Sequence, residues 1–181
     1  MTERHRVFIS YHHAADQVYK NKFVQLFANI TVDWSVRLGD IPNGLTTETI
    51  RQKIRDEWLR ESTVTVVLIG QQTWQRKHVD WEIGSSLRNT AKNPRSGLLG
   101  VLLPSYPAAR LNTYDVHTIP PRLADNLGES NSFGRIITWT ENPIEMKNWI
   151  HDAFIRRNQA PPPNNSRDSF VNNRVGDRWS Q

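Results

Sequence analysis

The sequence contains no cysteine among its 181 residues. That absence excludes a disulfide framework and every metal site built on thiolates. No apolar run approaches the ~18 residues that a membrane-spanning helix needs. The first residues, MTERHR, also lack the apolar core of a signal peptide. From these absences we expect a soluble, cytoplasmic protein without membrane contacts.

Several common site motifs are missing as well. There is no GxGxxG fingerprint and no P-loop, which argues against a hydride-transfer domain and against a P-loop NTPase. The six histidines are dispersed, and no pair shows ligand spacing supported by carboxylates. We therefore expect neither a metal site nor a bound cofactor.

The charge pattern says little about partners. The formal net charge is +5, but basic residues are scattered among acidic ones, as in the segment 51–57, RQKIRDE. A nucleic-acid-binding face usually shows a basic stripe with interleaved aromatic residues, so we expect no nucleic-acid partner. An anionic small molecule such as a dinucleotide is compatible with this balance.

Strands and helices alternate along the chain. Apolar runs predict buried strands at 6–11, 64–69, 97–103 and 134–139, with a brief strand at 33–36. Apolar rows at helical spacing predict helices after residue 12, from Thr46 or Thr47, over 79–91 and from Asn142. This order predicts an α/β fold, a flavodoxin-like three-layer sandwich. Its five-stranded parallel sheet has the order 2-1-3-4-5, with helices on both faces.

Three segments fall outside this alternation. Residues 37–45, RLGDIPNGL, form a flexible loop, and residues 104–132 show no clear period apart from one short helix near Ile119–Leu123. From residue 160 a tail rich in Pro, Asn and Arg follows, which we expect to be disordered or draped on the surface. We therefore divide the chain into one domain, 1–159, and a tail, 160–181.

The stretch 62–87 is the predicted centre of the molecule. Its strand, Val64–Ile69, leads into a polar turn, then into Trp74, a basic patch, and a helix that carries Glu82. Ligands of open parallel sheets bind beyond the carboxyl ends of the strands. The turn and the start of this helix are therefore the predicted site.

Motifs in three places carry a family resemblance. The first strand contains Phe8, Ser10 and His12, a Gly/Pro loop follows the second strand, and the third strand opens with Ser62. The string VLIGQQTWQRKHVDWEI then runs from Val67 to Ile83. Over roughly residues 4–155 the chain resembles the Toll/interleukin-1 receptor (TIR) domain family, in particular the bacterial TIR-like group of the Thoeris anti-phage system.

That resemblance implies an NAD⁺ nucleosidase or ADP-ribosyl cyclase, with NAD⁺ as substrate rather than cofactor. Such enzymes cleave the nicotinamide–ribose bond, and Thoeris members make a cyclised or conjugated ADP-ribose signal. The signal activates a separate effector protein during infection. Self-association through TIR contacts is implied as well, and hydrolysis, cyclisation and conjugation share the same first step.

Glu82 is the carboxylate that the motif assigns to catalysis. Nicotinamide leaves as a neutral molecule, so the reaction needs stabilisation of a ribosyl cation more than it needs an acid. Spacing alone allows a plainer interpretation, a solvated helical glutamate with His78 four residues before it. The resemblance favours the catalytic role.

Five further candidates precede the third strand. Ser10, Tyr11 and His12 end the first strand, where they either contact ribose or phosphate or satisfy the following turn. Asp40 and Ile41 lie in the Gly/Pro loop. They could line the nicotinamide side of the site, or the loop could contact a neighbouring subunit. The plainer interpretation is a simple mobile loop.

Three more candidates lie between the third strand and its helix. Trp74 either stacks on nicotinamide or adenine or packs at the rim of the sheet. Arg76 and Lys77 either pair with the pyrophosphate or form a solvated basic turn.

Two other functions fit the same pattern. A TIR adaptor that only binds other TIR domains would use the loop 37–45 as its contact, and Glu82 would be dispensable. A flavodoxin-like nucleoside glycosyl-transfer enzyme would also use a carboxylate but would accept nucleosides.

Overall fold

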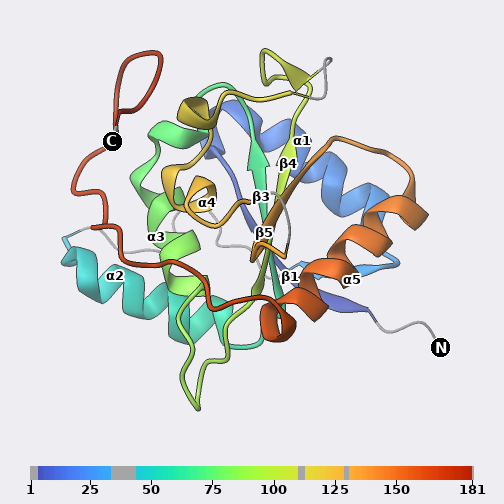
Figure 1. The fold of residues 1–181 in the computed structure, drawn as a ribbon, viewed down its shortest axis with the longest axis horizontal. Coiled ribbons are helices and arrows are strands. Elements are labelled where there is room, and N and C mark those ends of the chain that lie inside the picture. The colour runs from blue at the N-terminus through green and yellow to red at the C-terminus, as the bar shows by residue number, and fades with distance from the viewer. Residues whose placement is uncertain (1–3, 34–43, 110–112, 129–130, 181) are drawn as a thin grey trace.

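The computed structural model describes residues 4–33, 44–109, 113–128 and 131–180. Five parallel strands form one sheet in the order β2-β1-β3-β4-β5 (Figure 1), which confirms the predicted flavodoxin-like topology. The strands are β1 (His5–Ser10), β2 (Thr31–Asp33), β3 (Val64–Ile69), β4 (Gly97–Leu102) and β5 (Gly134–Thr138).

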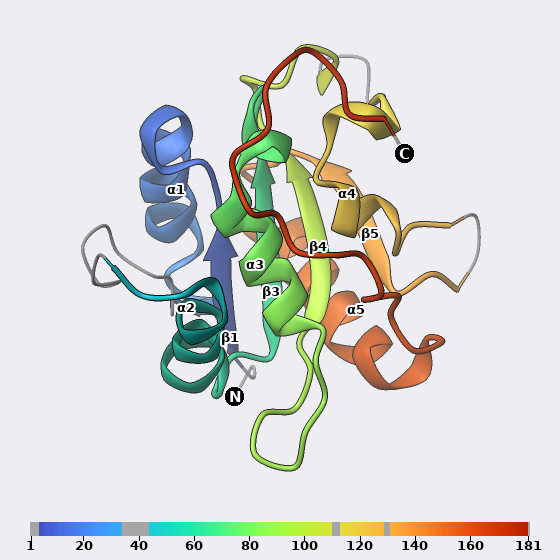
Figure 2. The ribbon, with the colours of Figure 1, turned by 90° about the vertical axis from the view of Figure 1, so that its left-hand side faces the viewer.

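Helices cover both faces of this sheet (Figure 2). One face carries α1 (His13–Phe27) and α5 (Pro143–Gln159). The other carries α2 (Thr47–Lys53) with its π-helical continuation η1 (Ile54–Leu59), α3 (Lys77–Ser86) and α4 (Pro121–Ala124). Two short 3₁₀ turns, η2 (Thr73–Gln75) and η4 (Val116–Thr118), lie in the connections.

Alternation along β1 decides what each of its side chains meets. Val7 and Ile9 enter the core under α1 and α5, whereas Phe8 packs with Trp81 of α3. Successive side chains of a strand point to opposite faces. Ser10, two residues after Phe8, therefore faces α3, and this places its hydroxyl beneath the helix that carries the candidate carboxylate.

Two predicted elements, the third helix and the second strand, differ most from the structure. The helix expected over 79–91 is α3, which begins at Lys77 and ends at Ser86. It ends early because the polar segment after it forms a turn, in which Asn93 donates its backbone N–H to Thr90 Oγ1. The second strand begins at Thr31, two residues earlier than expected, and residues 34–36 lie outside the described chain.

The tail, residues 160–180 as described, has no helix or strand and lies along α3 (Figure 2). Two aromatic residues anchor it, since Phe170 is 5% and Trp179 is 6% exposed. The tail thus packs against the domain through these two aromatic side chains, although its composition is otherwise polar.

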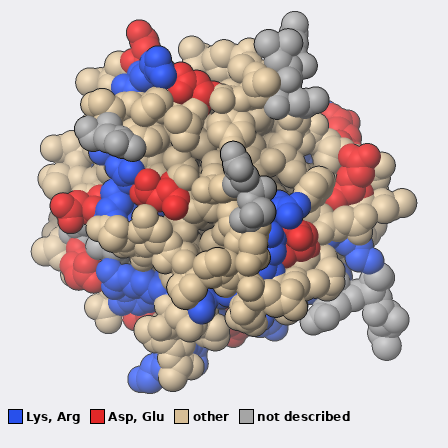
Figure 3. Space-filling view, in the orientation of Figure 1, with Lys and Arg blue, Asp and Glu red and all other residues tan. Residues whose placement is uncertain are grey.

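The surface mixes charges of both signs. On the face drawn in Figure 3, Lys and Arg side chains lie among Asp and Glu. Within the described ranges, no helix combines the length and the apolar character needed to cross a membrane.

Candidate active site at the carboxyl end of the sheet

A buried hydroxyl–carboxyl pair joins β1 to α3. Ser10 Oγ donates a hydrogen bond to Glu82 Oε2 at 2.5 Å, and the two residues are 0% and 2% exposed. Burial raises the pKa of Glu82 to about 8, while the hydrogen bond from Ser10 opposes that shift. The carboxyl group is therefore mostly protonated at neutral pH in this state.

The start of α3 is the predicted site, but Glu82 is buried beneath this helix and is only 2% exposed. Its helix packs directly on β1, so position 82 points into the sheet rather than along its edge. His78, the ordinary surface partner that spacing offered, makes its hydrogen bond elsewhere, from Nε2 to the Tyr11 carbonyl at 3.2 Å. The interpretation of Glu82 as a solvated surface glutamate is wrong.

A cluster of histidines surrounds the end of β1. The ring of His13 lies 4.5 Å from that of Tyr11 and 4.9 Å from that of His78, measured between centroids. Burial lowers the pKa of His78 to about 4, and the nearby His13 adds to the effect. Burial also lowers the pKa of His12 and of His13. The cluster is therefore neutral at physiological pH.

Two nitrogen atoms near this cluster lack a partner. His12 Nδ1 and Arg76 Nε are buried and form no hydrogen bond in the described structure. Arg76 donates from Nη2 to Gln75 Oε1 at 2.8 Å, and its charge contributes to the lowered pKa of His12. Both nitrogen atoms therefore keep an unused hydrogen-bonding capacity in the described structure.

The other candidates have different surroundings. Tyr11 is buried and donates its hydroxyl to Gln17 Oε1 at 2.7 Å. The Lys77 ammonium lies 5.3 Å from the centroid of the Trp81 ring, so it covers α3 rather than the histidine cluster. Asp40 and Ile41 lie outside the described residues.

Asp16 holds the strand ends together, a role that the sequence analysis did not assign. Although it is only 1% exposed, it accepts hydrogen bonds from Ser105 Oγ at 3.0 Å and from Thr73 Oγ1 at 3.4 Å. Burial raises its pKa, and these two hydrogen bonds oppose that shift. A side chain at Gly70 would overlap the Asp16 carboxyl group and displace it from these hydrogen bonds.

A cavity of about 310 Å³ opens beyond the ends of β3 and β4. Trp74 and Tyr106, which are 2% and 3% exposed, form part of its wall. Tail residues Gly176 and Asp177 form another part, whereas Glu82 is not among the described residues that line it. This cavity and the buried carboxyl group are therefore separate features.

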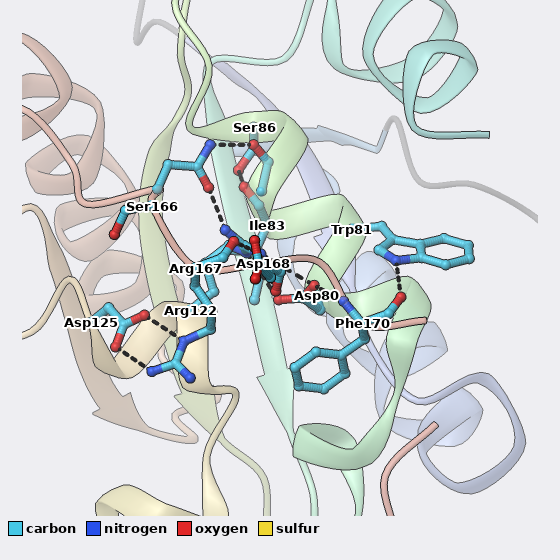
Figure 4. A network of polar contacts seen from close by, with 12 residues as sticks. Asp80, Trp81, Ile83, Ser86, Arg122, Asp125, Ser166, Arg167, Asp168 and Phe170 are labelled. Atoms are coloured by element: carbon cyan, nitrogen blue, oxygen red, sulfur yellow. Dashed lines mark hydrogen bonds and ion pairs between the residues drawn. The ribbon is translucent and has the colours of Figure 1, made fainter. Parts of the chain in front are cut away.

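An ion-pair network on the outer side of α3 holds the tail (Figure 4). Arg122 Nε donates to Asp80 Oδ1 at 2.9 Å, and both side chains are at most 2% exposed. Asp80 Oδ2 also accepts the backbone N–H of Phe170 at 3.0 Å, while Trp81 Nε1 donates to the Phe170 carbonyl. The isolated aromatics Phe170 and Trp179 were the available sequence signal for this packing.

Residues 8–108 match the family model of the TIR-like domain of the Thoeris protein ThsB, over more than half of the chain. The chain belongs to this family. No curated protein matches the sequence. Membership of the ThsB TIR-like family gives the chain a role in anti-phage defence. The ThsB match includes Ser10, Trp74 and Glu82, but it ends before Arg122, α5 and the tail.

Proposed function

We propose that this chain cleaves the nicotinamide–ribose bond of NAD⁺ and makes an ADP-ribose-derived signal for a separate effector. The observation that carries the proposal is the state of Glu82. It is a fully buried carboxyl group, and its hydrogen-bond partner among the described residues is the Ser10 hydroxyl rather than a cation. Carboxyl groups with strongly raised pKa values concentrate at functional sites.

The bond cleavage itself asks little of an acid. When the bond between C1′ of the ribose and the pyridinium nitrogen breaks, its electron pair neutralises the nitrogen, and nicotinamide leaves uncharged. C1′ then carries a developing positive charge that an ionised Glu82 stabilises. A nucleophile, either water or an atom of the ADP-ribose itself, adds to C1′ and loses its proton.

The raised pKa of Glu82 makes its ionisation depend on the substrate. An adjacent positive charge favours the carboxylate, so binding of the nicotinamide cation lowers the pKa from about 8. We expect kcat/KM, which reports the free protein, to rise with pH up to about 8. The acidic limb of kcat, which reports the complex, should lie at lower pH. Coincident limbs would contradict this account.

The unpartnered nitrogen atoms support an anionic substrate. Arg76 Nε lacks a partner in the described structure and lies close enough to His12 and His78 to lower the pKa of both. A guanidinium group with a free N–H is suited to a phosphate oxygen. We assign the pyrophosphate of NAD⁺ to Arg76.

Substrate contact requires the site to open. Glu82 is 2% exposed, so a ribose reaches it only after the neighbouring chain has moved. We propose that self-association through TIR contacts produces this opening. An assay of the purified chain therefore needs a range of protein concentrations up to the highest that remains soluble.

The decisive experiment follows NAD⁺ and its products by mass spectrometry, with purified protein and in infected cells. Wild type should consume NAD⁺ and yield nicotinamide with an ADP-ribose derivative, and Glu82→Gln should do neither. Glu61→Gln is the matched control, because Glu61 is an exposed carboxylate paired with Arg6. If wild type and Glu82→Gln behave alike in both settings, Glu82 is not catalytic.

The burial of Glu82 also favours a second candidate, a TIR adaptor without catalysis. Thermal unfolding with NAD⁺ separates the two. A binder gains about 2.7 kcal/mol at a ligand concentration 100 times its Kd, whereas an adaptor gains nothing. Consumption of nucleosides instead of NAD⁺ would indicate a glycosyl-transfer enzyme.

A further inference from the structure

The cavity beyond β3 and β4 has no role in the bond cleavage assigned to Glu82. We infer that it binds the adenine ring of the dinucleotide, and that the C-terminal tail supplies one of its walls. The identity of the substrate rests on the proposed function, whereas the preference for adenine is argued from the cavity itself. At about 310 Å³ the cavity falls at the small end of ligand pockets.

Its walls suit a flat, neutral heterocycle. Trp74 and Tyr106 make part of its wall apolar, although only 2% and 3% of their surface is exposed. Gln71 and Gln72 are exposed at its mouth and form no side-chain hydrogen bond with other described residues. Adenine presents an acceptor, N7, beside a donor, N6, and a glutamine carboxamide pairs with both.

The carboxylates of the cavity agree with this choice. Asp115 already forms an ion pair with Arg178 Nε at 3.0 Å and accepts a hydrogen bond from the backbone N–H of His117 at 2.9 Å. Asp177 has no such partner among the described residues. Its carboxylate can accept the exocyclic amino group of adenine, and it would repel a phosphate. The cavity is therefore a site for the base and not for the pyrophosphate.

The tail wall is held in place on both sides. Arg174 donates its backbone N–H to the Gln75 carbonyl, and Gln75 Nε2 donates to the Gly176 carbonyl, both at 2.8 Å. Beyond Asp177, Trp179 donates its backbone N–H to the His117 carbonyl at 2.9 Å. Figure 2 shows this end of the tail crossing from α3 over the carboxyl edge of the sheet. The wall is thus formed before any ligand binds.

Arg76 lies between the cavity and the end of β1. On one side its guanidinium contacts Gln75, a wall residue, and on the other its charge acts on His12. A dinucleotide likewise carries its pyrophosphate between its two nucleosides. The nicotinamide ribose must contact Glu82, which does not line the cavity. We therefore assign the cavity to adenine rather than to nicotinamide.

The test measures binding by calorimetry with two halves of the substrate, 5′-AMP and nicotinamide mononucleotide. The double variant Gln71→Ala/Gln72→Ala should weaken 5′-AMP binding about tenfold and leave the mononucleotide unchanged. Asp177→Ala should weaken 5′-AMP binding by a smaller factor. Gln52→Ala, at an exposed site on α2, is the matched control. With NAD⁺ as substrate, the double variant should raise KM and leave kcat unchanged.

Each result decides one question. The adenine assignment is overturned if 5′-AMP fails to bind wild type at millimolar concentration, or if the double variant binds it normally. It is also overturned if the mononucleotide shows the tenfold loss instead, because the cavity would then hold nicotinamide. Glu82→Gln should still bind 5′-AMP. NAD⁺ cleavage without 5′-AMP binding would contradict the adenine assignment and leave the proposed function intact. Binding of 5′-AMP without NAD⁺ cleavage would contradict the proposed function and leave the adenine assignment intact.

Discussion

The two sides of α3 treat a buried carboxyl group in opposite ways. Asp80 and Glu82 are two residues apart, and each is 2% exposed. Asp80 faces α4 and the tail, where Arg122 and the Phe170 N–H satisfy it. Glu82 faces β1, where a single hydroxyl, that of Ser10, satisfies it among the described residues.

Helix geometry explains the separation, because two residues correspond to a rotation of about 200°. The comparison teaches how to tell a structural carboxylate from a functional one at equal burial. A paired charge contributes to a defined packing arrangement, as Asp80 does for the tail. A buried carboxyl group without a countercharge has a raised pKa and stays largely protonated. Such a group indicates a role beyond packing.

The largest predicted effect is on the paired side. Asp80→Asn keeps the shape of the side chain but leaves the Arg122 charge buried without a countercharge. Breaking such a pair typically costs 3–5 kcal/mol, so we expect the free energy of unfolding to fall by about 4 kcal/mol. Chemical denaturation of wild type and variant measures this difference. Glu82→Gln, the matched change on the other side of α3, should unfold at a denaturant concentration at least as high as wild type. Equal losses in the two variants would refute the distinction.

The next prediction concerns pH. A raised pKa means that the folded state binds the Glu82 proton more tightly than the unfolded chain does. Its contribution to stability is therefore complete below the ordinary value of 4.5 and is lost as the pH rises to about 8. The loss has a maximum slope of about 1.4 kcal/mol per pH unit.

The contribution of Glu82 is isolated by subtracting the pH dependence of stability of wild type from that of Glu82→Gln. His78 acts in the opposite sense, because its lowered pKa makes the fold less stable as the pH falls from 6.5 towards 4. That contribution is common to wild type and Glu82→Gln. The stability advantage of Glu82→Gln over wild type should therefore grow from pH 5 to pH 8. A constant difference would mean that Glu82 does not titrate in this range.

A smaller effect is expected from Ser10→Ala. The Ser10 hydroxyl lowers the pKa of Glu82, so its removal raises that pKa further and leaves less carboxylate at neutral pH. We expect kcat/KM for NAD⁺ at pH 7 to fall about tenfold and its acidic limb to move to higher pH, as for a shift of one pKa unit. Ser180→Ala, at an exposed site, is the control. A tenfold loss without movement of the limb would assign Ser10 a direct contact with the substrate instead.

Local patterns were enough to predict the fold. The apolar runs of β1 and β3 and the row Val79, Ile83, Leu87 each describe one element and its buried residues. Strand order then follows from the short parallel crossovers. Patterns of this kind do not show how deeply a residue is buried, so spacing alone allowed Glu82 to be a solvated glutamate.

The contacts of Asp80 with α4 and the tail could not be predicted from such patterns. Asp80 and Arg122 are 42 residues apart, and Phe170 lies 90 residues from Asp80. No periodicity links residues across an irregular connection, because only the packed fold brings α4 and the tail to α3. The cavity walls likewise come from three separate segments and the tail.

The smallest predicted effect separates the exposed end of the tail network from its buried centre. Arg167 forms a bidentate pair with Asp125, with both distances 2.7 Å, but each side chain remains about one-fifth exposed, at 21% and 20%. Because solvent screens this pair, Arg167→Gln should lower stability by about 1 kcal/mol, well below the loss in Asp80→Asn. Hydrogen exchange should quicken in the tail and stay unchanged in β3. If Arg167→Gln instead unfolds the whole domain as readily as Asp80→Asn, exposure does not separate the two pairs, and the tail is held mainly by its surface contacts.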